Sequence, residues 1–203
     1  EEAYISLISN KIVHDKGTVL ITKVKKFICL GTPFDYNMFK FWNEYFHKDT
    51  RESNETTLTD INLIPMAGKG SRFVEQGYNS IKAMIQIENE SMFIKTTKSF
   101  PKSKKWIFIF RDTPKLKYSN ILSVIKDRFI KNEILVLQKE TSGQAATCLK
   151  AKDFLKPKKS LFIASCDYIS IYDHVKWEKM IKSKNKPDVI IWTYEPKDIV
   201  VKN

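Results

Sequence analysis

The chain has 203 residues and a formal net charge of +12. This length allows one globular domain with a core, or one domain with a short appendage. No apolar run approaches the roughly 18 residues of a membrane-spanning helix, so we expect no contact with a membrane. Glu1 and Glu2 open the sequence, which is not the pattern of a secretory signal peptide. Cys29, Cys148 and Cys166 are widely spaced, which argues against a disulfide framework or a zinc site and favours a reduced, cytoplasmic setting.

The charge is unevenly distributed along the chain. Residues 1–60 carry 8 Lys and Arg against 9 Asp and Glu, whereas residues 61–203 carry 27 against 14. A basic half is typical of proteins that bind nucleic acid, an anionic membrane or a phosphorylated small molecule. Because 31 of the 35 cations are Lys and nucleic-acid readers rely on Arg, we interpret most of them as solvated surface and rank nucleic-acid binding lowest.

The sequence of the first 47 residues predicts two helices with two short apolar runs between them. Helical spacing of apolar residues predicts a helix over 1–16, and β-branched residues favour a strand at 18–24. After a second apolar run at 27–30, Thr32 is a suitable N-cap and Pro33 a suitable first residue for a second helix. We interpret the aromatic face of that helix as core packing rather than as a base-stacking platform. The polar stretch 48–60 is interpreted as a linker.

From residue 61 onward, strand patterns alternate with helix patterns. The predicted strands are 61–66, 83–87, 106–110, 134–137, 161–165 and 189–193. The predicted helices are 92–100, 119 or 120 to about 130, 144–155, and one capped by Asp173 that runs to about 184. This alternation predicts an α/β fold, a three-layer, Rossmann-like arrangement with a mostly parallel sheet and helices on both faces.

A loop of small and cationic residues follows the first of these strands. It contains Gly68, Lys69, Gly70, Ser71 and Arg72. Such a loop can turn its backbone N–H groups toward a phosphate, and glycine permits both close approach and positive φ. The same Gly-x-Gly pattern is also typical of an ordinary tight turn.

Three further residues are candidates for phosphate chemistry. Asp167 follows an apolar strand, which suits an Mg²⁺ ligand beside a phosphate but also a helix or turn cap. Lys82 precedes a short strand and is either a phosphate contact or a surface lysine. Gln144 follows Gly143 and either reads a base edge or is an ordinary first-turn residue. Because ligands of parallel sheets lie beyond the carboxyl ends of the strands, we expect the glycine loop, 141–144 and 166–167 to converge.

Taken together, these motifs resemble a known family. Ile-Pro-Met-Ala-Gly-Lys-Gly-Ser-Arg-Phe at 64–73, Lys82, Thr-Ser-Gly-Gln-Ala at 141–145 and Ser-Cys-Asp-Tyr at 165–168 are similar to the sugar-1-phosphate nucleotidylyltransferases, also called nucleoside-diphosphate-sugar pyrophosphorylases. The resemblance covers about 61–195, the nucleotide-binding half of the family. It implies a GT-A-like nucleotidyltransferase fold and an enzyme that uses Mg²⁺, a nucleoside triphosphate and a sugar 1-phosphate. Whether the protein forms a homo-oligomer stays open.

The resemblance also implies a role for each matching residue. In the family, the glycine loop wraps the triphosphate and its arginine neutralises the outer phosphates; the matching residues are Ala67, Gly68, Lys69, Gly70, Ser71 and Arg72. The residue matching Lys82 contacts the phosphates, Gly143 and Gln144 match the pair that reads the base, and Asp167 matches the Mg²⁺ ligand. The implied products are a nucleotide sugar and pyrophosphate. The alternative is a non-catalytic domain that binds a nucleotide or assists assembly.

Residues 1–46 resemble the opposite, C-terminal end of the same family, so we expect 1–47 to be a C-terminal-like segment of such a domain. Either two such domains are fused in tandem and cut at both ends, or the order is permuted and 1–46 completes the sheet of 61–203. Two positions depart from the family pattern: Cys29 stands where many members have a second metal-binding aspartate, and Ile81 stands where many have proline. The first departure argues against a metal site with two carboxylates. The second departure weakens the assignment of Lys82.

Overall fold

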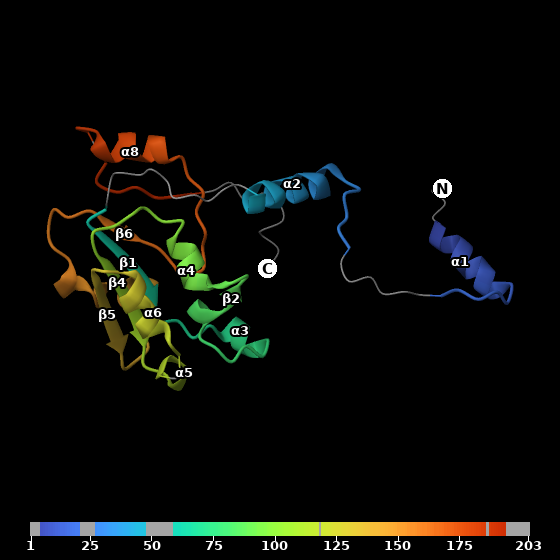
Figure 1. The fold of residues 1–203 in the computed structure, drawn as a ribbon, viewed down its shortest axis with the longest axis horizontal. Coiled ribbons are helices and arrows are strands. Elements are labelled where there is room, and N and C mark those ends of the chain that lie inside the picture. Colours follow the sequence, from blue (N-terminus) through green and yellow to red (C-terminus); the bar gives the residue numbers. More distant parts are fainter. Residues whose placement is uncertain (1–4, 21–26, 48–58, 118, 186, 194–203) are drawn as a thin grey trace. The chain divides into compact units, whose positions relative to one another are not determined.

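The computed structural model describes residues 5–20, 27–47, 59–117, 119–185 and 187–193. The chain divides into two compact units, Glu1–Arg51 and Glu52–Asn203, each of which is described by itself below (Figure 1). The division falls within the stretch predicted as a linker, of which 48–58 lie outside the described residues. None of the described helices combines the length and the apolar character that crossing a membrane requires.

The first unit contains helices α1, Ile5–His14, and α2, Pro33–His47. The predicted cap of α2 is confirmed, because Thr32 Oγ1 accepts a hydrogen bond from the backbone N–H of Asp35 at 3.1 Å and donates one to its carboxylate at 2.7 Å. The strand predicted at 18–24 is not seen at 18–20, and 21–26 lie outside the described residues.

The aromatic residues of α2 are exposed in the described part of this unit. Tyr36 is 54% exposed and Trp42 46% exposed, although Trp42 makes an edge contact with the ring of Phe41. The predicted core packing of this face is therefore not seen among the described residues.

The second unit is built on a four-stranded parallel sheet. Its strands are β1, Ile61–Met66, β4, Trp106–Arg111, β5, Asn132–Leu137, and β6, Leu161–Ile163, in the order β5-β4-β1-β6. Leu63 in β1 pairs with Ile107 in β4 and with Ile163 in β6. Since every pair is parallel, the carboxyl ends of all four strands lie at one edge of the sheet.

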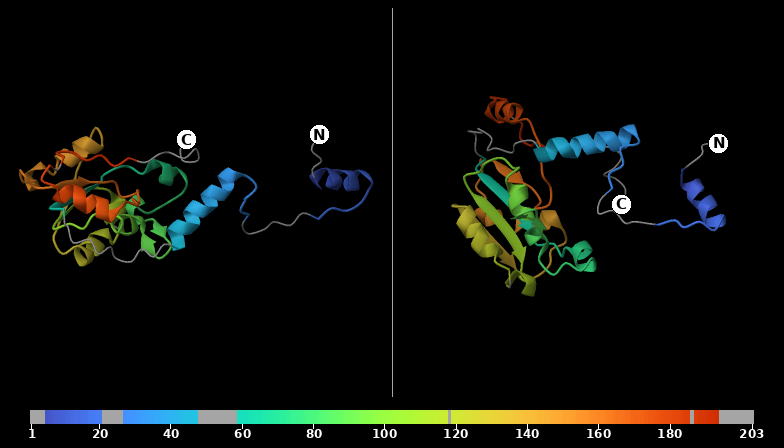
Figure 2. Two further views of the ribbon diagram at one scale, coloured as in Figure 1. Left: turned by 90° about the horizontal axis from the view of Figure 1, so that it is seen from above. Right: turned by 45° about the vertical axis from the view of Figure 1, so that its right-hand side comes forward.

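Alternation of side chains gives this sheet two buried faces. Ile64 and Phe108 pack with α4, Met92–Thr97, and α6, Ile121–Arg128, on one face. The opposite face is covered by α7, Gln144–Leu149, and by the 3₁₀ turn η2, Lys152–Phe154; its core consists of Ile61, Leu63, Ile107, Ile109 and Ala151. In Figure 2, α6 and the segment that contains α7 lie on opposite sides of the sheet. The predicted α/β fold with a mostly parallel sheet is confirmed.

The remaining elements are short. They are α3, Ser71–Glu75, the 3₁₀ turn η1, Lys82–Met84, the hairpin strands β2, Gln86–Ile87, and β3, Glu90–Ser91, then α5, Pro114–Lys117, and α8, His174–Lys182. The predicted cap of α8 is confirmed, because the Asp173 side chain accepts a hydrogen bond from the backbone N–H of Lys176 at 3.0 Å.

Three predicted elements differ from the structure. The strand predicted at 83–87 is a 3₁₀ turn followed by β2, and the helix predicted at 144–155 breaks after Leu149, where i→i+3 bonds around buried Ala151 turn the chain. The strand predicted at 189–193 is wrong, because no ladder hydrogen bond is found there and Val189 is 73% exposed. A short apolar run does not by itself supply a pairing partner.

Candidate functional site

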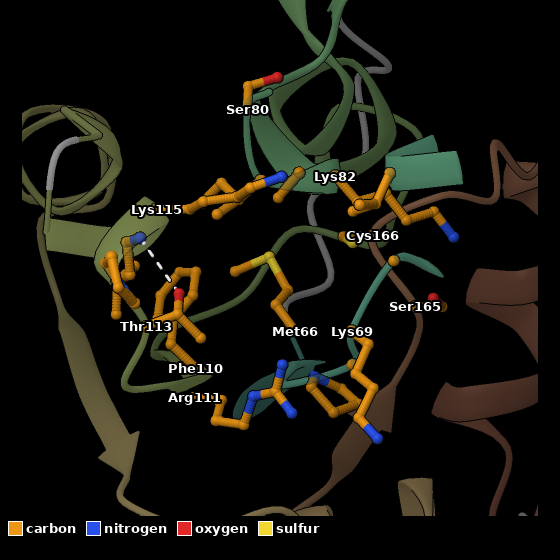
Figure 3. Close-up of a pocket in the computed structure, with 18 residues that line it drawn as sticks. Met66, Lys69, Ser80, Lys82, Phe110, Arg111, Thr113, Lys115, Ser165 and Cys166 are labelled. Carbon is orange, nitrogen blue, oxygen red and sulfur yellow. Dashed lines mark hydrogen bonds between the residues drawn. The ribbon is translucent and has the colours of Figure 1, made fainter. Parts of the chain in front are cut away.

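A pocket of about 540 Å³ lies at the carboxyl ends of β1 and β4 (Figure 3). The glycine loop, the segment that leads into η1 and the loop between β4 and α5 surround it. It is lined by Pro65, Met66, Gly68, Lys69, Gly70, Val74, Ser80, Ile81, Lys82, Ala83, Phe110, Arg111, Thr113, Pro114, Lys115, Leu116, Ser165 and Cys166.

The lining combines an apolar interior with cations. The four charged residues in it are Lys69, Lys82, Arg111 and Lys115, and no Asp or Glu of the described chain lines the pocket. Apolar side chains such as that of Phe110 form part of its wall. A pocket of this kind favours a ligand that joins an apolar group to a negatively charged one.

The two glycines of the loop have different reasons to be glycine. Gly70 is in the left-handed conformation, with φ 63° and ψ 31°, and a Cβ there would lie 3.4 Å from the Cβ of Lys82. Gly68 does not have positive φ, and a Cβ at that position would meet nothing within 4 Å. The backbone conformation therefore favours glycine at 70, whereas a side chain at position 68 would meet no neighbouring atom.

Asp167 fixes the position of Lys82 at one side of the pocket. Lys82 Nζ donates a hydrogen bond to Asp167 Oδ2, and Ser165 Oγ donates one to Oδ1. The two side chains of the ion pair are 32% and 22% exposed. Burial alone would raise the pKa of Asp167, but the hydrogen bonds from Lys82 and Ser165 outweigh it and hold that pKa below its ordinary value of 3.8. The carboxylate is therefore ionised at neutral pH. Lys82 Nζ also lies 5.7 Å from the centre of the Phe73 ring.

Glu140 connects two cations at the other side. Its Oε2 lies 2.9 Å from Lys69 Nζ and 3.6 Å from a guanidinium nitrogen of Arg111. The hydrogen bond from Lys69 lowers the pKa of Glu140 below its ordinary value. Glu140 belongs to the loop between β5 and α7, so this contact brings the glycine loop, the end of β4 and the end of β5 together.

The residues proposed from the sequence fall into three groups. Gly68, Lys69, Gly70 and Lys82 line the pocket, and Asp167 lies beside it through its bond to Lys82. Ala67 and Ser71 flank the lining residues in the loop, but neither lines the pocket. Arg72 is exposed on α3, and Gly143 and Gln144 are exposed at the start of α7; none of these three lines the pocket.

Sequence reasoning missed the contribution of the loop after β4. Arg111, Thr113 and Lys115 line the pocket from this loop. A signal for them was present, since the apolar strand 106–110 ends directly before Arg111 and the carboxyl ends of parallel strands meet at one edge.

The side chains around Asp167 can be compared with the ligands that the predicted Mg²⁺ would need. Among the described residues, no group of three or more His, Cys, Asp or Glu is arranged to hold a metal ion. Mg²⁺ often binds through one carboxylate and the phosphates of its substrate, and Asp167 with neighbouring Ser165 fits that pattern if Lys82 gives up its bond. Burial raises the pKa of the Cys166 thiol to about 11, so this side chain is a neutral thiol at neutral pH in the structure described here.

Comparisons with known proteins give a partial similarity in structure. A scan against protein-family models finds no match, and a search of curated proteins finds none either. Among solved structures, the chain is similar to the nucleoside-diphosphate-sugar pyrophosphorylase from Vibrio cholerae RC9, with 24% sequence identity and a TM-score of 0.45. The match covers 58% of this chain and 52% of that one, so this chain spans about half the length of that structure. The strand pairing within the chain itself defines its fold.

Proposed function

We propose that this chain contains the nucleotide-binding part of a nucleotidyltransferase that converts a nucleoside triphosphate and a sugar 1-phosphate into a nucleotide sugar and pyrophosphate. The observation that carries the proposal is the pocket at the carboxyl edge of the sheet, which has four cations in its lining and the glycine loop at its border. Its apolar interior suits a base or a sugar, and its cations suit phosphates.

The reaction asks the protein to position two anions and to neutralise their charge. An oxygen of the sugar phosphate attacks the α-phosphorus, a new P–O bond forms, and the bond to the β-phosphate breaks with its electron pair leaving on pyrophosphate. No covalent bond to the protein is needed, so positioning and charge carry the catalysis. In this proposal Lys69 and Lys82 contact phosphates from the pocket, the open space at Gly68 admits them, and Arg72 contacts the outer phosphates from α3.

Asp167 would hold the Mg²⁺ that this chemistry uses, and the metal would supply additional charge neutralisation on the phosphates. In the structure its carboxylate instead accepts hydrogen bonds from Lys82 and Ser165. A phosphate in the pocket offers Lys82 a second anionic partner. We therefore propose that Asp167 positions Lys82 before the ligand binds.

The proposal is tested by measuring pyrophosphate release from the full chain with a panel of triphosphates, sugar 1-phosphates and Mg²⁺. One pair of substrates should release pyrophosphate, and release from no pair would contradict the proposed reaction. By calorimetry, Arg72→Ala should weaken nucleotide binding, because Arg72 lies on α3 directly after the glycine loop. Lys126→Ala should not, because Lys126 is an exposed cation on α6, which packs on a face of the sheet. Equal binding by Arg72→Ala would remove the role proposed for Arg72.

A second function is a non-catalytic domain that binds a nucleotide or assists assembly. The observation that favours it is that both oxygens of Asp167 are already hydrogen-bonded within the protein. This function predicts nucleotide binding without pyrophosphate release from any pair of substrates. Detection of turnover would exclude it.

A further inference from the structure

We propose that Arg111 and Lys115, from the segment that follows β4, form a second anion-binding wall of the pocket in addition to the glycine loop, and that this wall binds the phosphates of a polyphosphate ligand. Both residues line the pocket together with Thr113, and all three come from the end of β4 and the start of α5. The identification of the ligand as a nucleotide rests on the proposed function, but the anion site itself rests on the charges of the pocket.

Arg111 is held in place by the sheet. It is the last residue of β4, a central strand, and it pairs with Leu137 at the end of β5. Its side chain is 20% exposed, and a guanidinium nitrogen lies 3.6 Å from Glu140. Glu140 also forms an ion pair with Lys69 at 2.9 Å, so one carboxylate serves two cations. A guanidinium fixed in this way is suited to bidentate contact with a phosphate.

Lys115 is directed into the pocket by the anchoring of α5. Thr113 Oγ1 accepts a hydrogen bond from the backbone N–H of Leu116 at 3.2 Å, and Leu116 is buried in the core. Lys115 Nζ donates to the backbone carbonyl of Tyr78 at 3.2 Å, a neutral partner that does not cancel its charge. In Figure 3 the side chain of Lys115 extends toward the segment that carries Ser80.

The charges around the pocket do not balance. Four cations line it, whereas the carboxylates bonded to them within the described chain are Asp167, which pairs with Lys82, and Glu140. An excess of two positive charges in a partly enclosed site favours a ligand with at least two negative charges. A polyphosphate satisfies this requirement, and a singly charged carboxylate does not.

The same short helix supplies a matched control. Lys117 lies two residues beyond Lys115, is 69% exposed, does not line the pocket, and lies 3.6 Å from Asp112. If general surface charge attracted the ligand, Lys117 and Lys115 would contribute equally. If the wall is a site, only Lys115 contributes.

The experiment is calorimetry of the full chain with metal-free tripolyphosphate at low salt, followed by the same titration with a nucleoside triphosphate. Lys115→Met and Arg111→Met should each weaken tripolyphosphate binding by about tenfold or more, as expected for loss of a charged hydrogen bond. Lys117→Met should change it by less than about twofold. Lys115→Arg should restore most of the binding. Circular dichroism and thermal melts of each variant show whether the fold is retained.

The outcomes separate this inference from the proposed reaction. The second wall is overturned if Lys115→Met and Arg111→Met leave tripolyphosphate binding unchanged. It is also overturned if the wild-type chain does not bind tripolyphosphate. Both conclusions hold whether or not the chain releases pyrophosphate. Equal losses in Lys115→Met and Lys117→Met overturn the second wall as well, because they indicate general attraction. If the two wall variants bind tripolyphosphate more weakly and the wild-type chain releases no pyrophosphate, the anion-binding wall is supported and the proposed transferase reaction is contradicted.

Discussion

The two sides of the pocket hold their cations in different ways. Asp167 is 22% exposed and accepts hydrogen bonds from both Lys82 and Ser165, whereas Glu140 is 54% exposed and is shared by Lys69 and Arg111. Salt screens a shielded ion pair only weakly, and removing one partner of such a pair leaves the other charge buried and costs free energy. Salt screens an exposed ion pair strongly, so another ion readily replaces either partner. We therefore expect Asp167 to fix Lys82 in place, and, under the proposed anion site, we expect a bound anion to replace Glu140 at Lys69 and Arg111.

The largest expected effect follows from breaking the shielded side. Asp167→Asn leaves Lys82 without its carboxylate in a site that is mostly enclosed. We expect the free energy of unfolding to fall by about 1–3 kcal/mol at pH 7, measured by urea denaturation, and any pyrophosphate release to be lost. An unchanged free energy of unfolding at pH 7 would show that the pair contributes no more than an exposed one.

The same variant has an expected dependence on pH. The folded pKa of Asp167 is lowered below 3.8, so the stabilisation is present above that value and is lost as pH falls through the lower, folded pKa. The difference in unfolding free energy between wild type and Asp167→Asn should therefore be constant near neutrality and shrink below about pH 3.8. A difference that persists in strong acid would assign the loss to packing rather than to charge.

The next effect separates the two glycines. Gly70→Ala places a Cβ in the left-handed region and 3.4 Å from the Cβ of Lys82, so we expect it to destabilise the fold by about 1–2 kcal/mol. Gly68→Ala meets no protein atom within 4 Å, so its thermal unfolding should match that of the wild type. Its nucleotide binding, measured by calorimetry, should nevertheless weaken, because Gly68 lines the pocket and the proposed phosphates approach the backbone there. Unchanged binding by Gly68→Ala would show that the ligand does not approach the loop there.

Local and topological signals in the sequence predicted much of this architecture. The apolar runs at 61–66 and 106–110 are central strands, and Thr32 and Asp173 cap helices as predicted, because capping depends on a few adjacent residues. The rule that ligands lie beyond the carboxyl ends of parallel strands predicted the edge at which the pocket is found.

Features that depend on tertiary partners were not predicted. The apolar run 189–193 has strand composition but no ladder partner in the described chain, and the break after Leu149 depends on Ala151 packing against the sheet. The pairing of Lys82 with Asp167 spans 85 positions and has no local signal. The start of α3 at Ser71 was likewise not predicted, and it places Arg72 on a short helix directly after the glycine loop.

The smallest effect tests the exposed side of the comparison. Glu140→Gln removes the carboxylate between Lys69 and Arg111, and because it is exposed the unfolding midpoint should not change measurably. Tripolyphosphate should bind about threefold more tightly by calorimetry, since the ligand no longer competes with Glu140 for the two cations. The gain should shrink as salt rises above about 0.15 M. Weaker binding by Glu140→Gln would instead mean that Glu140 positions Lys69, as Asp167 positions Lys82, and the two sides of the pocket would then work alike.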